Sequence, residues 1–151
     1  MFSRYYIRGP YLSVSMLKGA WPVWYFCTRM VLVIDNDAQF LYKAEGALRA
    51  AGHKVLVALS GSQALALMGT VGTEVHLIMV DLDLPNVSGF EVIQQMRGGF
   101  PDIPVIAFSG VMQNEMLEVA KYLGAKTALR KPITPEWMDA ISQAREPRSV
   151  A

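Results

Sequence analysis

The stretch LIMVDLDLPN, residues 77–86, places acidic side chains directly after a run of apolar ones. Four apolar residues suit a buried strand, and Asp81 and Asp83 follow before Pro85 ends the pattern. Burying a carboxylate is costly unless a cation or a metal ion pairs with it. The stretch therefore predicts a buried strand that ends at a charged site.

The sequence around this stretch alternates between two periods from Met30 onward. Short apolar runs typical of strands occupy residues 30–35, 53–59, 75–81, 103–109 and 126–132. Apolar residues at helical spacing occupy residues 37–52, 60–69, 88–98, 113–125 and 134–145. Local signals mark the helix limits: Ser60 as an N-cap, Ser88 and Glu91 as a capping box, Thr134 before Pro135, and the stops Gly52 and Gly124. Strands that alternate with helices predict an α/β fold, with a parallel sheet covered on both faces.

Polar residues gather at the predicted strand ends, where open parallel sheets bind their ligands. They are Asp35, Asn36 and Asp37 after the first strand, Asp81 and Asp83 after the third, Ser109 and Gly110 after the fourth, and Lys131 and Pro132 after the fifth. We therefore predict that the acids share one site with a cation and a metal ion.

This set of groups suits phosphoryl transfer onto a carboxylate. An aspartate can act as the nucleophile, and the charge on the transferring group must be offset. Asp35 and Asp81 supply oxygen ligands of the kind that Mg²⁺ prefers. Lys131 can bind a phosphate oxygen, the Ser109 hydroxyl can donate to another, and Gly110 leaves space for the incoming group.

Each of these side chains also has a plain structural reading. An aspartate at a strand end is most often an N-cap, which is the reading favoured for Asp37. Ser109 and Lys131 suit turn chemistry and a solvated charge, His53 and His76 read as strand-flanking residues, and Trp137 reads as packing. The joint placement of the polar residues at one edge of the sheet favours a site.

The amino-acid composition limits which classes of protein this chain can belong to. The 151 residues are 52% hydrophobic and carry a net charge of +1, which favours one globular domain and gives no sign of a nucleic-acid partner. The single cysteine, Cys27, cannot form an internal disulfide, which fits a reducing compartment.

Residues 1–29 differ from the rest. They hold four of the 14 basic residues and none of the 13 acidic ones, and they show no clean period. Pro10, Lys18 and Pro22 interrupt any run long enough to span a membrane. We expect a poorly ordered or loosely packed extension, with a membrane-surface anchor or read-through from an earlier start codon as alternatives.

The motifs VLVIDND, LIMVDLDLPNVSGFEVI, IPVIAFSG and ALRKPI together resemble the response-regulator receiver domain of two-component signalling, in its chemotaxis-regulator-like form. The resemblance covers residues 30 to about 145. It implies a flavodoxin-like, doubly wound sheet of five strands in the order 2-1-3-4-5. It also implies that a histidine kinase or a histidine phosphotransfer protein phosphorylates Asp81. Mg²⁺ would be held by Asp35, Asn36, Asp81 and the backbone carbonyl of Asp83, with Ser109 as the switch hydroxyl and Lys131 as the phosphate-binding lysine.

Two residues depart from the pattern of that family. A second acid usually follows the first, whereas this chain has Asn36, so weak Mg²⁺ binding is expected. A Tyr or Phe often stands three residues before the lysine and swings inward on activation, whereas this chain has Ala128, which cannot signal in that way.

The resulting prediction is a cytoplasmic, single-domain receiver over residues 30–146, followed by a frayed tail at 147–151. It would phosphorylate itself from a donor rather than act as a classical enzyme, and it would signal to an effector protein. The alternatives are a pseudo-receiver that only binds partners, a small phosphatase of the haloacid-dehalogenase type, and a receiver cut from a hybrid kinase.

Overall fold

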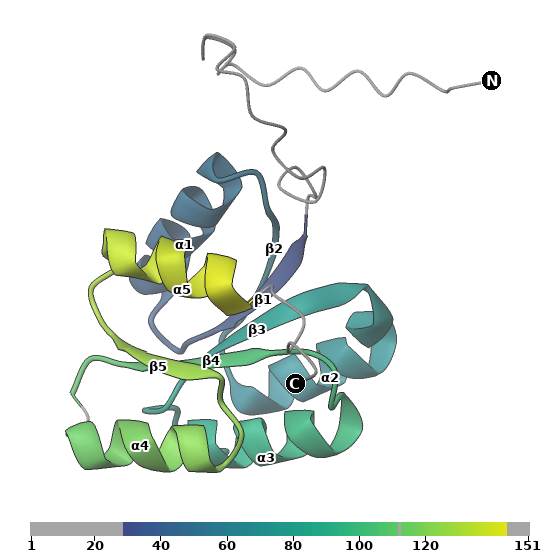
Figure 1. Ribbon diagram of the computed structural model, residues 1–151. Coiled ribbons are helices and arrows are strands. Elements are labelled where there is room, and N and C mark those ends of the chain that lie inside the picture. The colour runs from purple at the N-terminus through teal and green to yellow at the C-terminus, as the bar shows by residue number, and fades with distance from the viewer. Residues whose placement is uncertain (1–28, 112, 145–151) are drawn as a thin grey trace, which may run out of the picture.

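Five parallel strands form one sheet, in the order β2-β1-β3-β4-β5, in the computed structural model of this chain (Figure 1). The structure describes residues 29–111 and 113–144. The strands are β1 (Met30–Ile34), β2 (Lys54–Ala58), β3 (Val75–Asp81), β4 (Val105–Ser109) and β5 (Thr127–Arg130). The predicted α/β class and strand order are confirmed. The expected extension up to residue 28 and the tail at 147–151 lie outside the described residues.

The helices follow the strands in turn. They are α1 (Ala38–Ala50), α2 (Gly61–Val71), α3 (Gly89–Gly99), α4 (Asn114–Tyr122) and α5 (Pro135–Ala144), and a short 3₁₀ helix, η2 (Gly72–Glu74), links α2 to β3. Figure 1 shows α1 and α5 on one side of the sheet and α2, α3 and α4 on the other. Both faces of the sheet are therefore covered, as near-continuous apolar strands require.

Alternating side chains of each strand feed two separate hydrophobic clusters. In β3, Leu77 and Met79 pack with α1 and α5, while Ile78 and Val80 pack with α2, α3 and α4. All four are nearly or fully buried. Because successive strand residues point to opposite faces, an unbroken apolar run serves both clusters at once. The core thus holds the sheet from both sides and leaves its strand ends free for polar groups.

Local capping residues fix where the helices begin. The Asp37 side chain accepts from the N–H groups of Gln39 and Phe40, and Ser60 accepts from the N–H of Gln63. The capping-box serine, Ser88, accepts from the backbone N–H of its partner at 3.3 Å. The N-cap readings of Asp37, Ser60 and Ser88 are therefore confirmed.

Several predicted limits are wrong by a few residues. The strand expected from residue 103 begins at Val105, because the Ile103 N–H closes a turn onto Phe100 and Pro104 has no N–H to give. The helix expected to reach 125 ends at Tyr122, and Gly124 follows with a φ of 120°. Helix α2 runs to Val71, beyond the expected 69, and η2 was not expected. Turns of this size depend on hydrogen bonds that no period in the sequence reveals.

Gly89, the first residue of α3, brings the helix against the backbone of β3. A Cβ at this position would overlap the carbonyl of Asp81 and the Cα of Leu82. The glycine therefore sets the distance between α3 and the loop that carries the acidic residues.

Replacing Gly89 by Ala is expected to lower the free energy of unfolding by about 1–3 kcal/mol, because the added methyl group overpacks rigid backbone. Gly46→Ala is the matched control, since nothing lies within 4 Å of a Cβ added there in α1. The control should stabilise the protein by about 0.5–1 kcal/mol through helix propensity. Urea unfolding measures both values, and a Gly89→Ala protein as stable as the wild type would contradict this account.

Candidate functional site

The carboxyl ends of the strands bring two acids and one lysine into direct contact. The Nζ atom of Lys131 lies 2.7 Å from Asp35 Oδ2 and 2.9 Å from Asp81 Oδ2. Asp35 follows β1, Asp81 ends β3, and these strands are neighbours in the sheet. Asp35 and Asp81 are almost fully buried, so each needs the lysine as a counter-charge. The sequence-predicted cluster of Asp35, Asp81 and Lys131 is therefore assembled in space.

Backbone N–H groups fix the orientation of both carboxylates. The N–H of Asp37 donates to Asp35 Oδ1 at 2.8 Å, and the N–H of Asp83 donates to Asp81 Oδ1 at 2.9 Å. In each case the donor stands two residues after the acid. Each aspartate thus uses one oxygen to hold its own loop and presents the other to Lys131.

Two aromatic rings lie against the Lys131 ammonium, and the sequence did not predict this contact. The Lys131 ammonium lies 4.4 Å from the ring centroid of Phe40 and 5.5 Å from that of Phe108. These rings also pack against Trp137, whose indole N–H donates to the backbone carbonyl of Arg130 at 2.9 Å. The expected packing role of Trp137 is confirmed. The cation–π contacts place the ammonium beside the two acids.

The electrostatics of the cluster follow from burial and pairing. Burial raises the pKa of Asp81 above its ordinary value, and the Asp35 charge acts in the same direction, against the Asp83 N–H and Lys131. Burial by itself would lower the pKa of Lys131, but its contacts with Asp35 and Asp81 outweigh it and the pKa is raised. The lysine therefore keeps its proton at neutral pH and remains a cation in the site.

Ser109, at the end of β4, joins the cluster through Asp83. Its hydroxyl donates to Asp83 Oδ2 at 2.6 Å, and its backbone carbonyl accepts from the N–H of Lys131 at 3.0 Å. The next residue, Gly110, is exposed and lies beside the Lys131 side chain, where an added Cβ would be 3.5 Å from Cδ. The side-chain contact of Asp83 was not anticipated, because the sequence suggested a role only for its backbone carbonyl.

The two residues that depart from the resemblance lie at less constrained positions. Asn36 is exposed, directly after the buried Asp35. Ala128 is half-buried in β5 and packs against the cluster formed with α2, α3 and α4. Neither residue is fixed by the contacts that hold Asp81 and Lys131.

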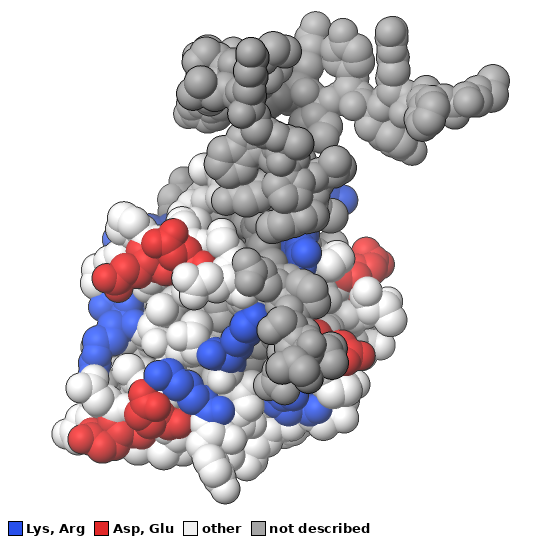
Figure 2. All heavy atoms as spheres, viewed as in Figure 1, with Lys and Arg blue, Asp and Glu red and all other residues white. Residues whose placement is uncertain are grey.

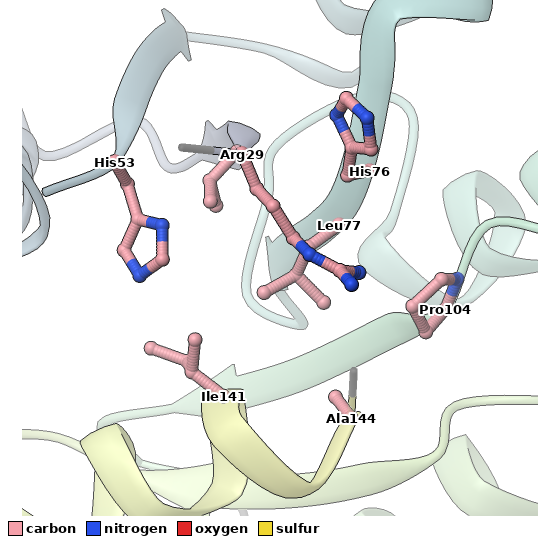
Figure 3. A pocket seen from close by; sticks show the side chains of 8 residues that line it. Arg29, His53, His76, Leu77, Pro104, Ile141 and Ala144 are labelled. Atoms are coloured by element: carbon pink, nitrogen blue, oxygen red, sulfur yellow. The ribbon is translucent and has the colours of Figure 1, made fainter. Parts of the chain in front are cut away.

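The two histidines lie at the opposite edge of the sheet. His53 directly precedes β2 and His76 is the second residue of β3, so both stand at amino ends of strands. Figure 3 shows their rings on either side of the Arg29 side chain. The N–H of Met30 donates to His76 Nδ1 at 3.3 Å. The strand-flanking reading is confirmed for His53, whereas His76 lies inside β3, next to its first residue.

The oxygen groups at the carboxyl edge fit a Mg²⁺ ion that keeps several of its waters. Among residues 29–111 and 113–144, no three His, Cys, Asp or Glu side chains are grouped to hold a metal. Mg²⁺ needs fewer, because one or two carboxylates with carbonyls and waters suffice. The buried Oδ2 of Asp35 has the Lys131 ammonium as its ion-pair partner, and no hydrogen-bond partner in the described part of the chain. This oxygen and Asp81 suit the ion.

Lys131→Gln is expected to lower the free energy of unfolding by about 2–4 kcal/mol, because it leaves two buried carboxylates without their cation. Lys121→Gln is the matched control: Lys121 pairs with Glu118 on the surface, where the two side chains are 41% and 69% exposed. The control should change stability by less than about 0.5 kcal/mol. Denaturant unfolding without divalent ions measures both, and equal effects would contradict the buried pairing.

The geometry agrees with comparisons to known proteins. The sequence profile of the response regulator receiver domain matches residues 31–142. The response regulator SaeR of Staphylococcus aureus is 25% identical over 105 residues, which are 70% of this chain and 45% of SaeR. This chain therefore spans less than half of that relative.

Solved structures give the same picture. A receiver domain protein from Clostridium thermocellum superposes with a TM-score of 0.73 at 26% identity, over 78% of this chain and 94% of that one. A chain of the CheX–CheY complex from Borrelia burgdorferi has a TM-score of 0.75 at 16% identity, over 79% of this chain and 90% of that one, which shows the fold alone. In the described ranges, no helix is long and apolar enough to cross a bilayer. Fold, site geometry and sequence profile together show that this chain belongs to the response regulator receiver domain family of two-component signalling.

Proposed function

We propose that this chain is a single-domain receiver that accepts a phosphoryl group on Asp81 from a histidine kinase or a histidine phosphotransfer protein. The observation that supports this most directly is the Lys131 ammonium held between Asp35 and Asp81 at the ends of neighbouring strands. Such a site offers a nucleophile and a cation for the incoming charge. We propose residues 30–146 as the receiver domain, with the flanking residues outside it.

The transfer forms a bond between a carboxylate oxygen of Asp81 and phosphorus. The phosphorus–nitrogen bond of the donor phosphohistidine breaks, and the donor nitrogen leaves with its electron pair. Lys131 offers its ammonium to a phosphoryl oxygen, since it already contacts Asp81 Oδ2. Gly110 presents no side chain beside Lys131, which leaves room for the group that arrives.

Mg²⁺ would be held by the carboxylates of Asp35 and Asp81, the amide oxygen of Asn36 and the backbone carbonyl of Asp83. When bound, the ion offsets negative charge on the transferring group.

The output is proposed to be a protein–protein contact with an effector. The outer surface of α4 exposes Met116, Val119 and Tyr122, the last of them 91% exposed. Exposed apolar side chains of this kind are typical of interaction surfaces. On the face drawn in Figure 2, acidic and basic side chains of the described residues are interspersed, so no single charge dominates it.

Incubation with acetyl phosphate and Mg²⁺ is expected to add the mass of one phosphoryl group to the wild type and none to Asp81→Asn, because the amide is a poor nucleophile. Asp102→Asn is the control, since Asp102 is an exposed acid at the other edge of the sheet. Intact-mass spectrometry reads the result. Equal labelling of Asp81→Asn and the wild type would refute Asp81 as the acceptor.

Two other outcomes would identify the alternatives. A folded wild type that takes no phosphate would be a pseudo-receiver that only binds partners. Steady release of inorganic phosphate from small phosphate esters would indicate a phosphatase.

Asn36→Asp is expected to tighten Mg²⁺ binding about tenfold or more, because a nearby unit charge is worth roughly 1–4 kcal/mol at the dielectric of a surface site. Asp37→Asn is the control, because Asp37 caps α1 and asparagine caps a helix equally well. Calorimetric titration with MgCl₂ compares the dissociation constants. An unchanged constant in Asn36→Asp would mean that residue 36 does not face the ion.

A further inference from the structure

The Ser109 hydroxyl is already committed to a carboxylate before any phosphoryl group arrives. It donates to Asp83 Oδ2 at 2.6 Å, and its oxygen accepts from the N–H of Val111 at 3.2 Å. Ser109 is fully buried, so water does not compete for this contact. A short hydrogen bond to an ionised acceptor is about twice as strong as a neutral one.

Asp83 is itself held in place by the acceptor aspartate. Its backbone N–H donates to Asp81 Oδ1 at 2.9 Å, while its side chain receives the Ser109 hydroxyl. One residue therefore connects the nucleophile of the proposed reaction to the hydroxyl at the end of the next strand. This connection needs a side-chain oxygen acceptor at position 83, because the Ser109 hydroxyl donates to Oδ2 of that residue.

A serine hydroxyl has one proton to donate. The hydroxyl therefore cannot donate to Asp83 and to a phosphoryl oxygen on Asp81 at the same time. The hydrogen bond to Asp83 must break before the hydroxyl can contact the phosphoryl group. The free energy of that bond therefore disfavours the phosphorylated state. The negative charge of Asp83, two residues from Asp81, opposes the same state by repulsion.

We propose that Asp83 is a positioning residue that acts as a brake on the phosphorylated state by holding the Ser109 hydroxyl away from the phosphoryl group. The proposal rests on the proposed function, in which Asp81 carries that group. It adds that the identity of residue 83 sets the phosphorylated fraction of this chain, through Ser109.

The test is a double-substitution cycle on residues 83 and 109. At limiting acetyl phosphate with Mg²⁺, Asp83→Ala is expected to raise the ratio of phosphorylated to free protein about fivefold, the equivalent of one net hydrogen bond of about 1 kcal/mol. In a Ser109→Ala background the same substitution should raise this ratio by less than about twofold, because no hydroxyl is left to release.

Two control variants separate charge from hydrogen bonding. Asp83→Asn keeps the shape of the side chain but not its charge, and its ratio of phosphorylated to free protein should lie between those of the wild type and Asp83→Ala. Asp37→Asn removes a charge that does not touch Ser109 and should leave the ratio within about twofold of the wild type.

Thermal unfolding without phosphate measures the contact on its own. The double alanine variant should lose less Tm than the sum of the two single-variant losses, and the difference should be about 2–6 °C. If Asp83→Ala raises the phosphorylated fraction equally in the wild-type and Ser109→Ala backgrounds, the proposed role of Asp83 is overturned, because the loss of its charge alone would explain the change. The proposal is also overturned if the Tm losses of the two single variants add up to that of the double variant.

If the wild type and all variants take no phosphate, the proposed function fails, and the role of Asp83 fails with it. If the wild type is labelled but the cycle is additive, only the brake fails.

Discussion

One ammonium shared by two buried carboxylates is the constraint on which the site depends. Asp35 and Asp81 stand at the carboxyl ends of neighbouring strands and are nearly inaccessible to water. Without a cation, their two charges would repel each other at a place where water hydrates neither carboxylate. Lys131 meets this need, and the rings of Phe40 and Phe108 lie beneath it. The two acids and the lysine together carry a net charge of −1, which a divalent cation can reverse.

The sequence was most informative where one local rule decides the structure. Unbroken apolar runs alternate with helical periods, and the sheet, its covered faces and nearly all its elements follow from that alternation. The caps Asp37, Ser60 and Ser88 were readable because a short polar side chain before a helix has few other uses. The strand order came from the resemblance, since alternation alone does not fix which strands are neighbours.

The features that escaped prediction depend on contacts between distant segments. Phe40 and Phe108 look like ordinary core residues in the sequence, and only the fold brings them under Lys131. Likewise, Asp83 and Ser109 are separated by 26 positions, so no spacing rule connects the carboxylate to the hydroxyl. Gly89 reads as a plain helix start, although it is required by the backbone of β3. Such contacts are set by packing geometry, which composition and periodicity do not encode.

The exposure of Asn36 has a consequence for how this chain can change over generations. The hydrophobic clusters on both faces of the sheet do not include residue 36, whereas Asp35 beside it is fully enclosed. In the proposed metal site, a change at residue 36 would alter the charge offered to Mg²⁺ without repacking the interior. On that proposal, a single substitution at residue 36 would adjust the affinity for Mg²⁺ while the fold stays unchanged. The affinity for the metal ion and the stability of the fold would then be able to change independently in descendants of this sequence.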